Sequence, residues 1–456
     1  MEVIGFIICI GVIAITAILL YRRFNPQGVL IIAGLLMVSL AALMGLNPIA
    51  VNKPSGSVIF DLVQVIDDGF VSNVTRIGLM IMTIGGYVAF MNKIKATDSL
   101  VYIALKPLAF FRKYPYLASV MAIPIGQVLF MTIPSAAGLG LLLVASFYPV
   151  LVSLGCSRMT ALSVIAAATI FDQGPGSANT AMAASLIGIP NVEYFFTYQL
   201  PIVVPTTVIV MILYYFSNRH FDRKEMKEGR DIFVKTSEKT VKPDVPLIYA
   251  ILPMLPLILL VAFSEYVGLF DIHLSTTVAM LFSLIVSVVF MLLFKRNFRD
   301  VIDMLDSFWK GMGTVFSSVV TLIVSAEIFS KGLISMGFID TLVSGSTHLG
   351  FSGAAISILI TVLIFMAAML MGSGNAAFFS FGPLMPDIAP SLGMSAPDMI
   401  LPMQLSASMG RATSPIAGII VAIAGIAGVS PVELAKRNIP PLVGGLMTLL
   451  LFHFLL

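Results

Sequence analysis

Long apolar runs separated by short polar segments dominate this chain. A helix of about 20 apolar residues crosses the hydrocarbon core of a bilayer. Two further apolar regions, 114–190 and 352–430, are interrupted by Gly, Pro, Ser and Asn. The pattern predicts an all-α polytopic membrane protein in which some irregular backbone lies at membrane depth. The uninterrupted runs lie at about 2–21, 28–46, 76–92, 198–217, 247–263, 273–294, 312–334 and 441–456.

Composition agrees with this reading. Of the 456 residues 58% are hydrophobic and 11% charged, and the mean hydropathy is +1.02, whereas soluble domains carry about 25% charged residues. No small-residue cleavage site follows the first apolar run, so we expect a spanning helix there and not a signal peptide. The lipid bilayer is therefore the first expected partner.

The two interrupted regions resemble each other. The segment "PSAAG" at Ser135 corresponds to "GSGNA" at Ser373, 238 residues later, and "SLGCS" corresponds to "SLGMS" at the same separation. Further on, Pro175 corresponds to Pro415, 240 residues later. An ordered set of matches at a nearly constant separation indicates an internal repeat.

The distribution of Lys and Arg predicts that the copies are inverted. Basic clusters at 22–23, 93–113, 219–242, 295–310 and 436–437 contrast with the stretch from Gly332 to Gly410, which has no Lys or Arg. Under the positive-inside rule the clusters are cytoplasmic and the empty stretch is external. Cationic loops thus flank the first hairpin region, and no cationic loop flanks the second. The same charge distribution predicts that both termini lie outside.

Inverted repeats with broken helices are typical of secondary transporters, whose substrate site forms where unwound segments meet. We expect repeat 1 at 1–217, a cytoplasmic linker at 218–246 and repeat 2 at 247–456. Each repeat should hold about five transmembrane helices. It should also hold one re-entrant hairpin (about 115–152 and 352–390) and one helix broken at the midplane (about 158–190 and 397–430). Hairpins and broken helices should form the transport unit, and the other helices the scaffold.

The tetrapeptide "GSGN" at 372–375 is the expected tip of the second hairpin. Gly374 permits a tight reversal, and the start of a helix directs free backbone N–H groups toward an anion. A second reading remains open, in which these small residues only allow helices to pack closely.

Arg411 is the one basic residue between Gly332 and Ser430. A charge inside the membrane costs about 2.5–3.5 kcal/mol on insertion scales, which favours a paired or functional role. Its guanidinium suits a carboxylate, and a structural ion pair with Asp172 or Glu327 is the alternative. Asp172, in the first broken helix, is the candidate for coupling to H⁺ or Na⁺, or else a structural partner.

Other classes of function find no support in the sequence. The four histidines are far apart and none has metal-ligand spacing with a partner, and no Gly-rich phosphate loop with Lys-Ser/Thr occurs. We expect no enzyme activity, no metal, no bound cofactor and no nucleic-acid partner.

Three segments carry a resemblance to a known family: "GSGNAAFFSF", "MGRATSPIAGIIVAIAG" and "SPVELAKRNIPPLVGG". They are similar to the anaerobic C4-dicarboxylate carriers of Dcu type C, and the similarity extends over nearly the whole chain. It implies a bacterial inner-membrane carrier that exports succinate or exchanges it for related dicarboxylates such as fumarate and malate. In such a membrane the two termini, which the charge distribution places outside, are expected to be periplasmic. A more distant similarity to the ion-transporter superfamily implies a homodimer and an elevator-type motion.

By position, the resemblance places several polar residues at the substrate site. The first half fits less well, because the family pattern has an acid where this chain has Asn179. A carrier of amino acids or short-chain monocarboxylates remains the alternative, and an anion channel is less favoured. The expected substrate-binding residues are Ser135, Ser177, Asn179, Ser373, Gly374, Asn375, Arg411, Thr413 and Ser414.

Overall fold

The computed structural model describes residues 2–46, 51–111, 113–230, 232–233, 243–265, 267, 272, 274–295, 298–339, 341, 344–345 and 352–455. This part of the chain is helical and contains no strand. Ten of its helices are long and apolar enough to cross a membrane. The expectation of an all-α polytopic membrane protein is confirmed at this level. The ten candidate spans are Ile4–Tyr21, Pro26–Leu43, Val58–Lys93, Pro115–Thr132, Ala136–Ser153, Asn191–Lys227, Thr276–Phe294, Phe298–Ser335, Gly353–Met371 and Pro431–Leu455.

The first half of the chain contains four short helices, α5, α8, α9 and α10, beside its long ones. A π-helical turn, Val74–Gly78, joins α3 to α4, and a second one, Phe195–Gln199, joins α10 to α11. The helices are α1 (Glu2–Tyr21), α2 (Pro26–Leu43), α3 (Val58–Asn73), α4 (Leu79–Lys93), α5 (Ala96–Leu105), α6 (Pro115–Thr132), α7 (Ala136–Ser153), α8 (Arg158–Ala167), α9 (Ala178–Ile187), α10 (Asn191–Tyr194) and α11 (Leu200–Lys227).

The second half follows a similar order. A 3₁₀ turn, Leu247–Met254, precedes α12, and a π-helical turn, Phe316–Val320, joins α15 to α16. The helices are α12 (Leu255–Ala262), α13 (Thr276–Lys295), α14 (Phe298–Met304), α15 (Asp306–Val315), α16 (Thr321–Ser335), α18 (Gly353–Met371), α19 (Gly374–Phe381), α20 (Met385–Ser391), α21 (Ala396–Ala412), α22 (Gly418–Ala427) and α23 (Pro431–Leu455).

Several helices extend beyond the apolar runs in the sequence. The runs at 76–92, 312–334 and 441–456 belong to continuous helices over Val58–Lys93, Phe298–Ser335 and Pro431–Leu455. Charged residues such as Asp61 and Asp306 lie in the extensions. They lower the hydropathy of a window but cost a helix only about 0.7 kcal/mol each or less. Hydropathy therefore marked the apolar part of each of these helices and missed the residues at its N-terminal end.

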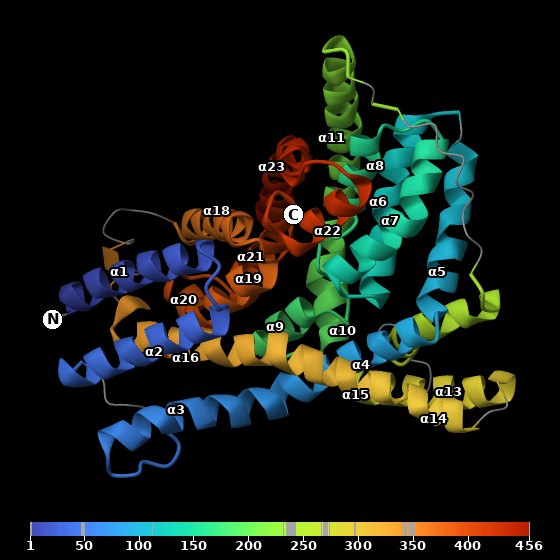
Figure 1. The fold of residues 1–456 in the computed structure, drawn as a ribbon. Coiled ribbons are helices and arrows are strands. Elements are labelled where there is room, and N and C mark those ends of the chain that lie inside the picture. Colours follow the sequence, from blue (N-terminus) through green and yellow to red (C-terminus); the bar gives the residue numbers. More distant parts are fainter. Residues whose placement is uncertain are drawn as a thin grey trace.

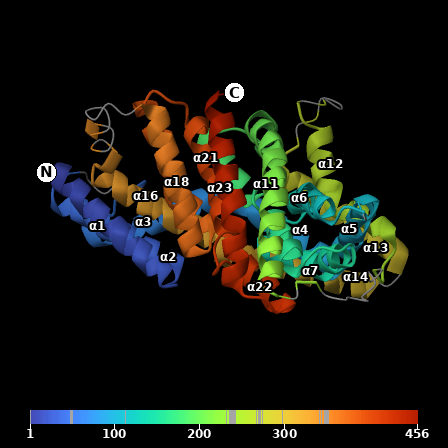
Figure 2. The same ribbon diagram turned by 90° about the horizontal axis from the view of Figure 1, so that it is seen from above.

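Figure 1 shows two groups of helices. Helices α1–α4 and α13–α16 lie along one side, and α6–α11 with α18–α23 lie on the other. Within the first group α2 packs against α16 and α4 against α15. Gly34 permits close contact of backbones there, because a Cβ atom on it would lie 2.6 Å from the carbonyl group of Ile328. In the second group α11 and α23 lie side by side near the centre (Figure 2).

A buried ion pair joins α11 to α23 at the C-terminal end of α11. The side chains of Arg437 and Asp222 are 1% and 0% exposed and form a direct ion pair. Arg437 Nη1 also lies 3.4 Å from Glu225 Oε1. Its Nε donates to Asn218 Oδ1 at 2.8 Å. The charge of Arg437 is thus compensated by two carboxylates and an amide of one neighbouring helix.

Two further helices supply hydrogen bonds to the same Asp222 carboxylate. From α8, the hydroxyls of Ser157, at its N-cap, and Thr160 donate to it at 2.8 and 2.9 Å. From α6, the Tyr116 hydroxyl donates at 3.1 Å. Four helices therefore meet at one buried network. Because α11 continues to Lys227, the first residues of the expected linker at 218–246 are helical, and Asn218 and Asp222 are buried.

We predict that Arg437→Met strongly destabilises the protein. The substitution leaves Asp222 buried without its counter-ion, which costs about 3–5 kcal/mol. The thermal unfolding midpoint in detergent measures the effect. Lys310→Met is the matched control, because Lys310 forms an exposed ion pair with Asp306 at 2.6 Å, and its midpoint should stay near wild type. Equal midpoints for the two variants would contradict the prediction.

Candidate functional site

Two helices are broken within the second group. The first break lies at 168–177, between α8 and α9, and the second at 413–417, between α21 and α22. Gly174 in the first break has φ +94°, a conformation that favours glycine. Ser177 then caps α9, and its hydroxyl accepts hydrogen bonds from the backbone N–H groups of Asn179 and Thr180 at 3.1 and 3.2 Å. The local sequence thus ends one helix and starts the next.

Two helix reversals lie next to these breaks. The chain turns between α6 and α7 just before Ser135 and between α18 and α19 just before Ser373. Each serine caps the following helix, and its hydroxyl accepts a backbone N–H at 3.3 or 3.2 Å. The remaining N–H groups of the first turn have no partner within the helix. Ser135 and Ser373 therefore lie at helix starts next to the reversals, and their side-chain oxygens already accept backbone N–H groups.

Glycines bring each reversal close to its break. A Cβ on Gly374 would lie 2.8 Å from the carbonyl oxygen of Ala407 in α21. Gly372 has φ +70°, and a Cβ atom on it would lie 3.1 Å from the backbone nitrogen of Ala417 in the second break. Gly174 lies against the side chain of Met131, at the end of α6. A Cβ on Gly374 would overlap the backbone of α21, so Gly374 has a packing role whatever else it does.

Arg411 reaches from the second break to the first. It lies in the last turn of α21 and is 8% exposed. Its Nη2 donates to the carbonyl oxygen of Thr169 at 2.6 Å, and its guanidinium carbon lies 5.9 Å from the centre of the Phe130 ring. The Nε atom is buried and has no hydrogen-bond partner. Arg411 thus contacts the first break and the first hairpin, with part of its hydrogen-bonding capacity unused.

The carboxylate of Asp172 is held within its own break. It accepts hydrogen bonds from Ser177 Oγ at 2.6 Å and from Asn179 Nδ2 at 3.2 Å, and Asp172 is 5% exposed. The structure therefore brings together three of the predicted residues. Among the ion pairs of the described residues, no pair joins Asp172 to Arg411.

Glu327 is not a partner of Arg411 either. It lies in α16, where it pairs with Lys331 at 3.0 Å and accepts a hydrogen bond from Asn73. Arg411 therefore forms no direct ion pair among the described residues, although the Asp172 carboxylate lies near enough to interact with it electrostatically.

Gln404 connects α21 to the first break and was not predicted. This buried residue of α21 donates from Nε2 to the carbonyl oxygen of Asp172 at 3.1 Å, and its Oε1 accepts from the Tyr194 hydroxyl at 3.0 Å. The sequence signal was one amide within the apolar stretch "MILPMQLSAS". A single uncharged polar residue in a helix does not indicate its partner, so only the fold reveals this contact.

The predicted residues of the second break mainly stabilise that break. Thr413 Oγ1 donates to the carbonyl oxygen of Gly410 at 2.7 Å, and Ser414 Oγ accepts from the backbone N–H of Ile416 at 3.4 Å. Asn438 of α23 donates to the carbonyl oxygen of Ala412 at 3.0 Å. Ser414 is fully buried and Asn375 partly exposed.

Several buried polar atoms near the breaks have no hydrogen-bond partner. Buried polar groups are normally satisfied, so unsatisfied ones suit a polar ligand or an ion. The described residues contain no group of three or more His, Cys, Asp and Glu side chains that could hold a metal ion. The unpaired atoms are Arg411 Nε, Gln173 Oε1, Asn179 Oδ1, Ser408 Oγ and Asn438 Oδ1.

Two solved structures share the overall fold. One is the Neisseria gonorrhoeae protein MtrF, described as one of a class of antimetabolite efflux pumps, with a TM-score of 0.66, 14% identity and 96% of each chain covered. The other is the YdaH transporter of Alcanivorax borkumensis, with a TM-score of 0.59, 14% identity and coverage of 94% of this chain and 98% of that one. At this identity the likeness shows the fold alone.

Sequence relatives are much closer. The chain is 32% identical over 443 residues to the anaerobic C4-dicarboxylate transporter DcuC of Escherichia coli, which covers 96% of this chain and 94% of that protein. It is 30% identical over 455 residues to a Vibrio cholerae protein named "Probable anaerobic C4-dicarboxylate transporter DcuC", with 99% and 98% covered. The family model "C4-dicarboxylate anaerobic carrier" matches residues 4–456. The chain therefore belongs to the DcuC family of transporters.

Proposed function

We propose that the protein is a secondary transporter of C4-dicarboxylates such as succinate, fumarate and malate, working by efflux or exchange. The observation that carries this is Arg411, a buried cation between the two helix breaks that has an unused donor and no direct ion pair among the described residues. A bidentate bond from a guanidinium to a carboxylate is strong and directional. The names of the relatives supply the substrate class.

The second carboxylate of the substrate needs another partner. The helix starts at Ser135 and Ser373 offer free backbone N–H groups and the positive ends of helix dipoles, which favour anions. In this proposal Arg411 binds one carboxylate and a hairpin tip the other. In the same proposal Asn375, in the first turn of α19, and Asn179, with its free Oδ1 atom, would contact the substrate.

The architecture we propose is a pair of inverted repeats, at 1–217 and 247–456, joined by the linker at 218–246. Corresponding helices begin at constant separations, which supports it. The starts of α6 and α18, at 115 and 353, and those of α8 and α21, at 158 and 396, are both 238 residues apart. The starts of α9 and α22, and of α10 and α23, are both 240 residues apart.

We further propose an elevator-type motion in which the second group of helices moves against the first. Because the Arg437 network ties α11 and α23 to α6 and α8, these helices should travel with the hairpins and breaks. Helices α1–α4 and α13–α16 would then form the scaffold and a homodimer interface. The basic clusters support a bacterial inner-membrane orientation with both termini periplasmic.

An amino-acid or short-chain monocarboxylate carrier is the rival interpretation, since Asp172 could hold a substrate ammonium group. Competition binding in detergent with succinate, fumarate, aspartate and a neutral amino acid separates the two. Succinate and fumarate should compete best. Preferential binding of the neutral amino acid would overturn the dicarboxylate assignment.

We predict that Arg411→Lys weakens succinate binding by about 10- to 150-fold. An ammonium cannot reproduce the bidentate fork of a guanidinium, and hydrogen bonds to charged groups contribute about 1.5–3 kcal/mol. Calorimetric titration measures the affinity, and the thermal midpoint confirms folding. Arg230→Lys, at an exposed arginine, is the control. Wild-type affinity in Arg411→Ala would show that Arg411 does not bind the substrate.

We predict that Asp172→Asn separates exchange from coupled transport. A dicarboxylate carries about two negative charges, and an inside-negative potential favours its exit by about 2.3 kcal/mol per charge per 100 mV. Uptake therefore needs H⁺ or Na⁺, which Asp172 is proposed to bind. In proteoliposomes the variant should keep dicarboxylate exchange but lose the response of net uptake to pH or Na⁺ gradients.

Asp306→Asn, an exposed change, is the control for Asp172→Asn and should keep both activities. Asp172 would instead be structural if Asp172→Asn failed to fold and the double variant Asp172→Arg with Arg411→Asp restored folding without transport.

We predict that a cross-link between the two helix groups stops transport. The rings of Phe329 in α16 and Phe381 in α19 have centres 6.1 Å apart. In a background without Cys9 and Cys156, cysteines at these two positions should cross-link in this conformation and block transport in proteoliposomes.

The matched control joins two helices of the same group. Thr207 Oγ1 in α11 donates to Gln127 Oε1 in α6 at 3.0 Å. Cysteines there should cross-link with little loss of transport, because both helices move together. Unchanged transport after cross-linking of Phe329→Cys with Phe381→Cys would rule out the proposed motion.

A further inference from the structure

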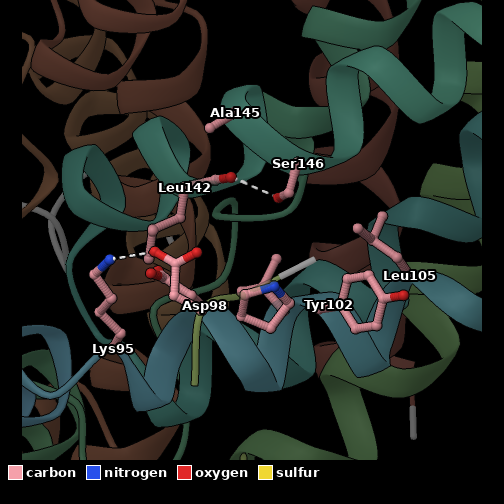
Figure 3. Close-up of a pocket in the computed structure, with 10 residues that line it drawn as sticks. Lys95, Asp98, Tyr102, Leu105, Leu142, Ala145 and Ser146 are labelled. Atoms are coloured by element: carbon pink, nitrogen blue, oxygen red, sulfur yellow. Dashed lines mark hydrogen bonds and ion pairs between the residues drawn. The ribbon is translucent and has the colours of Figure 1, made fainter. Parts of the chain in front are cut away.

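A separate cavity of about 240 Å³ lies between α5 and α7. Figure 3 shows Lys95, Asp98 and Tyr102 along α5, facing Leu142 and Ser146 of α7. Pro243 and Asp244, which precede the 3₁₀ turn at Leu247–Met254, line it as well. None of its lining residues belongs to the candidate substrate site.

The charged groups of this cavity are only partly paired. Lys95 Nζ forms an exposed ion pair with Asp244 Oδ2 at 2.8 Å. An ammonium group has three N–H donors, so two remain for another acceptor. Within the described part of the chain, the Asp98 carboxylate has no hydrogen bond or ion pair. One cation and two carboxylates thus give the cavity a net charge of about −1. Free N–H donors on Lys95 and free acceptor oxygens on Asp98 remain for a ligand.

Burial raises the pKa of the Asp98 carboxyl above its ordinary value, Lys95 acts against this shift, and the charge of Asp244 adds to it. A bound cation would relieve the cost of keeping Asp98 ionised.

The remaining walls are apolar. Val101 and Leu105 come from α5, and Leu142 and Ala145 from α7. Tyr102 adds an aromatic ring with a polar tip, a side chain that favours the interface between headgroups and acyl chains. The cavity therefore combines charged groups with an apolar surface.

The position of α5 places this cavity at the edge of the membrane. It follows directly after the candidate span that ends at Lys93. With ten residues it is about 15 Å long, too short to cross. The cavity beside α5 therefore lies at the depth of the phospholipid headgroups.

We propose that the cavity binds the headgroup of phosphatidylethanolamine. Its primary ammonium group would donate to Asp98 and Asp244, and its phosphate would accept from Lys95. Charge-assisted hydrogen bonds of this kind are stronger than neutral ones. Phosphatidylcholine has the same charges but no N–H donor, and phosphatidylglycerol has no cation for the two carboxylates.

A bound lipid would also connect two proposed parts of the transporter. Helix α5 packs against α4 of the first group and against the 3₁₀ turn at Leu247–Met254, and it also contacts α7 of the second group. The headgroup would bridge this boundary. This site stands independently of the proposed substrate, because its test measures lipid binding and not transport.

Native mass spectrometry of the delipidated full-length protein in detergent tests the proposal. Phosphatidylethanolamine, phosphatidylcholine and phosphatidylglycerol with identical acyl chains are titrated separately. Wild type should retain the ethanolamine lipid about ten-fold more tightly than either of the others. Equal retention of the three lipids, or preference for phosphatidylglycerol, would overturn the proposal.

Charge variants show whether the preference arises at this cavity. Asp98→Asn should lower retention of the ethanolamine lipid to the level of the choline lipid. Asp98→Asn combined with Asp244→Asn leaves Lys95 unopposed, so the preference should reverse toward phosphatidylglycerol, which a misfolded protein would not show. Asp306→Asn, in the exposed pair on α15, is the control and should keep the wild-type preference. An unchanged preference in the double variant would place the lipid elsewhere.

Discussion

A backbone that leaves the helix inside a membrane must find its hydrogen-bond partners within the protein, because hydrocarbon offers none. The rest of the site depends on this constraint. Each break has carbonyl groups that are satisfied by polar side chains from other helices, and these side chains fix how the breaks face each other. The contacts are Arg411 to Thr169, Gln404 to Asp172, Asn191 to Pro175 and Asn438 to Ala412.

Two buried arginines differ in how far their hydrogen-bonding groups are paired within the protein. Arg437 is surrounded by carboxylates, an amide and a hydroxyl, so its charge is compensated within the protein. Arg411 has one backbone carbonyl at 2.6 Å and an aromatic ring, and its Nε remains unpaired. Asp172 is the nearby carboxylate but forms no direct ion pair with Arg411, and a buried charge that is incompletely paired is expensive. The contrast assigns a stabilising role to Arg437 and supports a ligand-binding role for Arg411.

Helix α23 connects these two systems. Arg437 binds α11 and α8 in the buried network, and the next residue, Asn438, donates to the end of α21 directly after Arg411. A displacement of α23 would therefore affect the ion pair and the second break together. This arrangement provides a physical reason for the second group of helices to behave as one body.

The sequence alone determined the membrane class, and it drew attention to the interruptions in two apolar regions and to the two charged residues within them. Those features are local: apolar length, Gly and Pro positions and isolated charges can be read from neighbouring residues. Only the tertiary structure decided the partners. Gln404, Asn438 and the pair of Asp222 with Arg437 join residues far apart in the chain, and each looks unremarkable beside its sequence neighbours. Residues 436–437 look like a basic cluster, yet Arg437 is buried. Whether its side chain faces solvent or a buried carboxylate depends on which helices pack together.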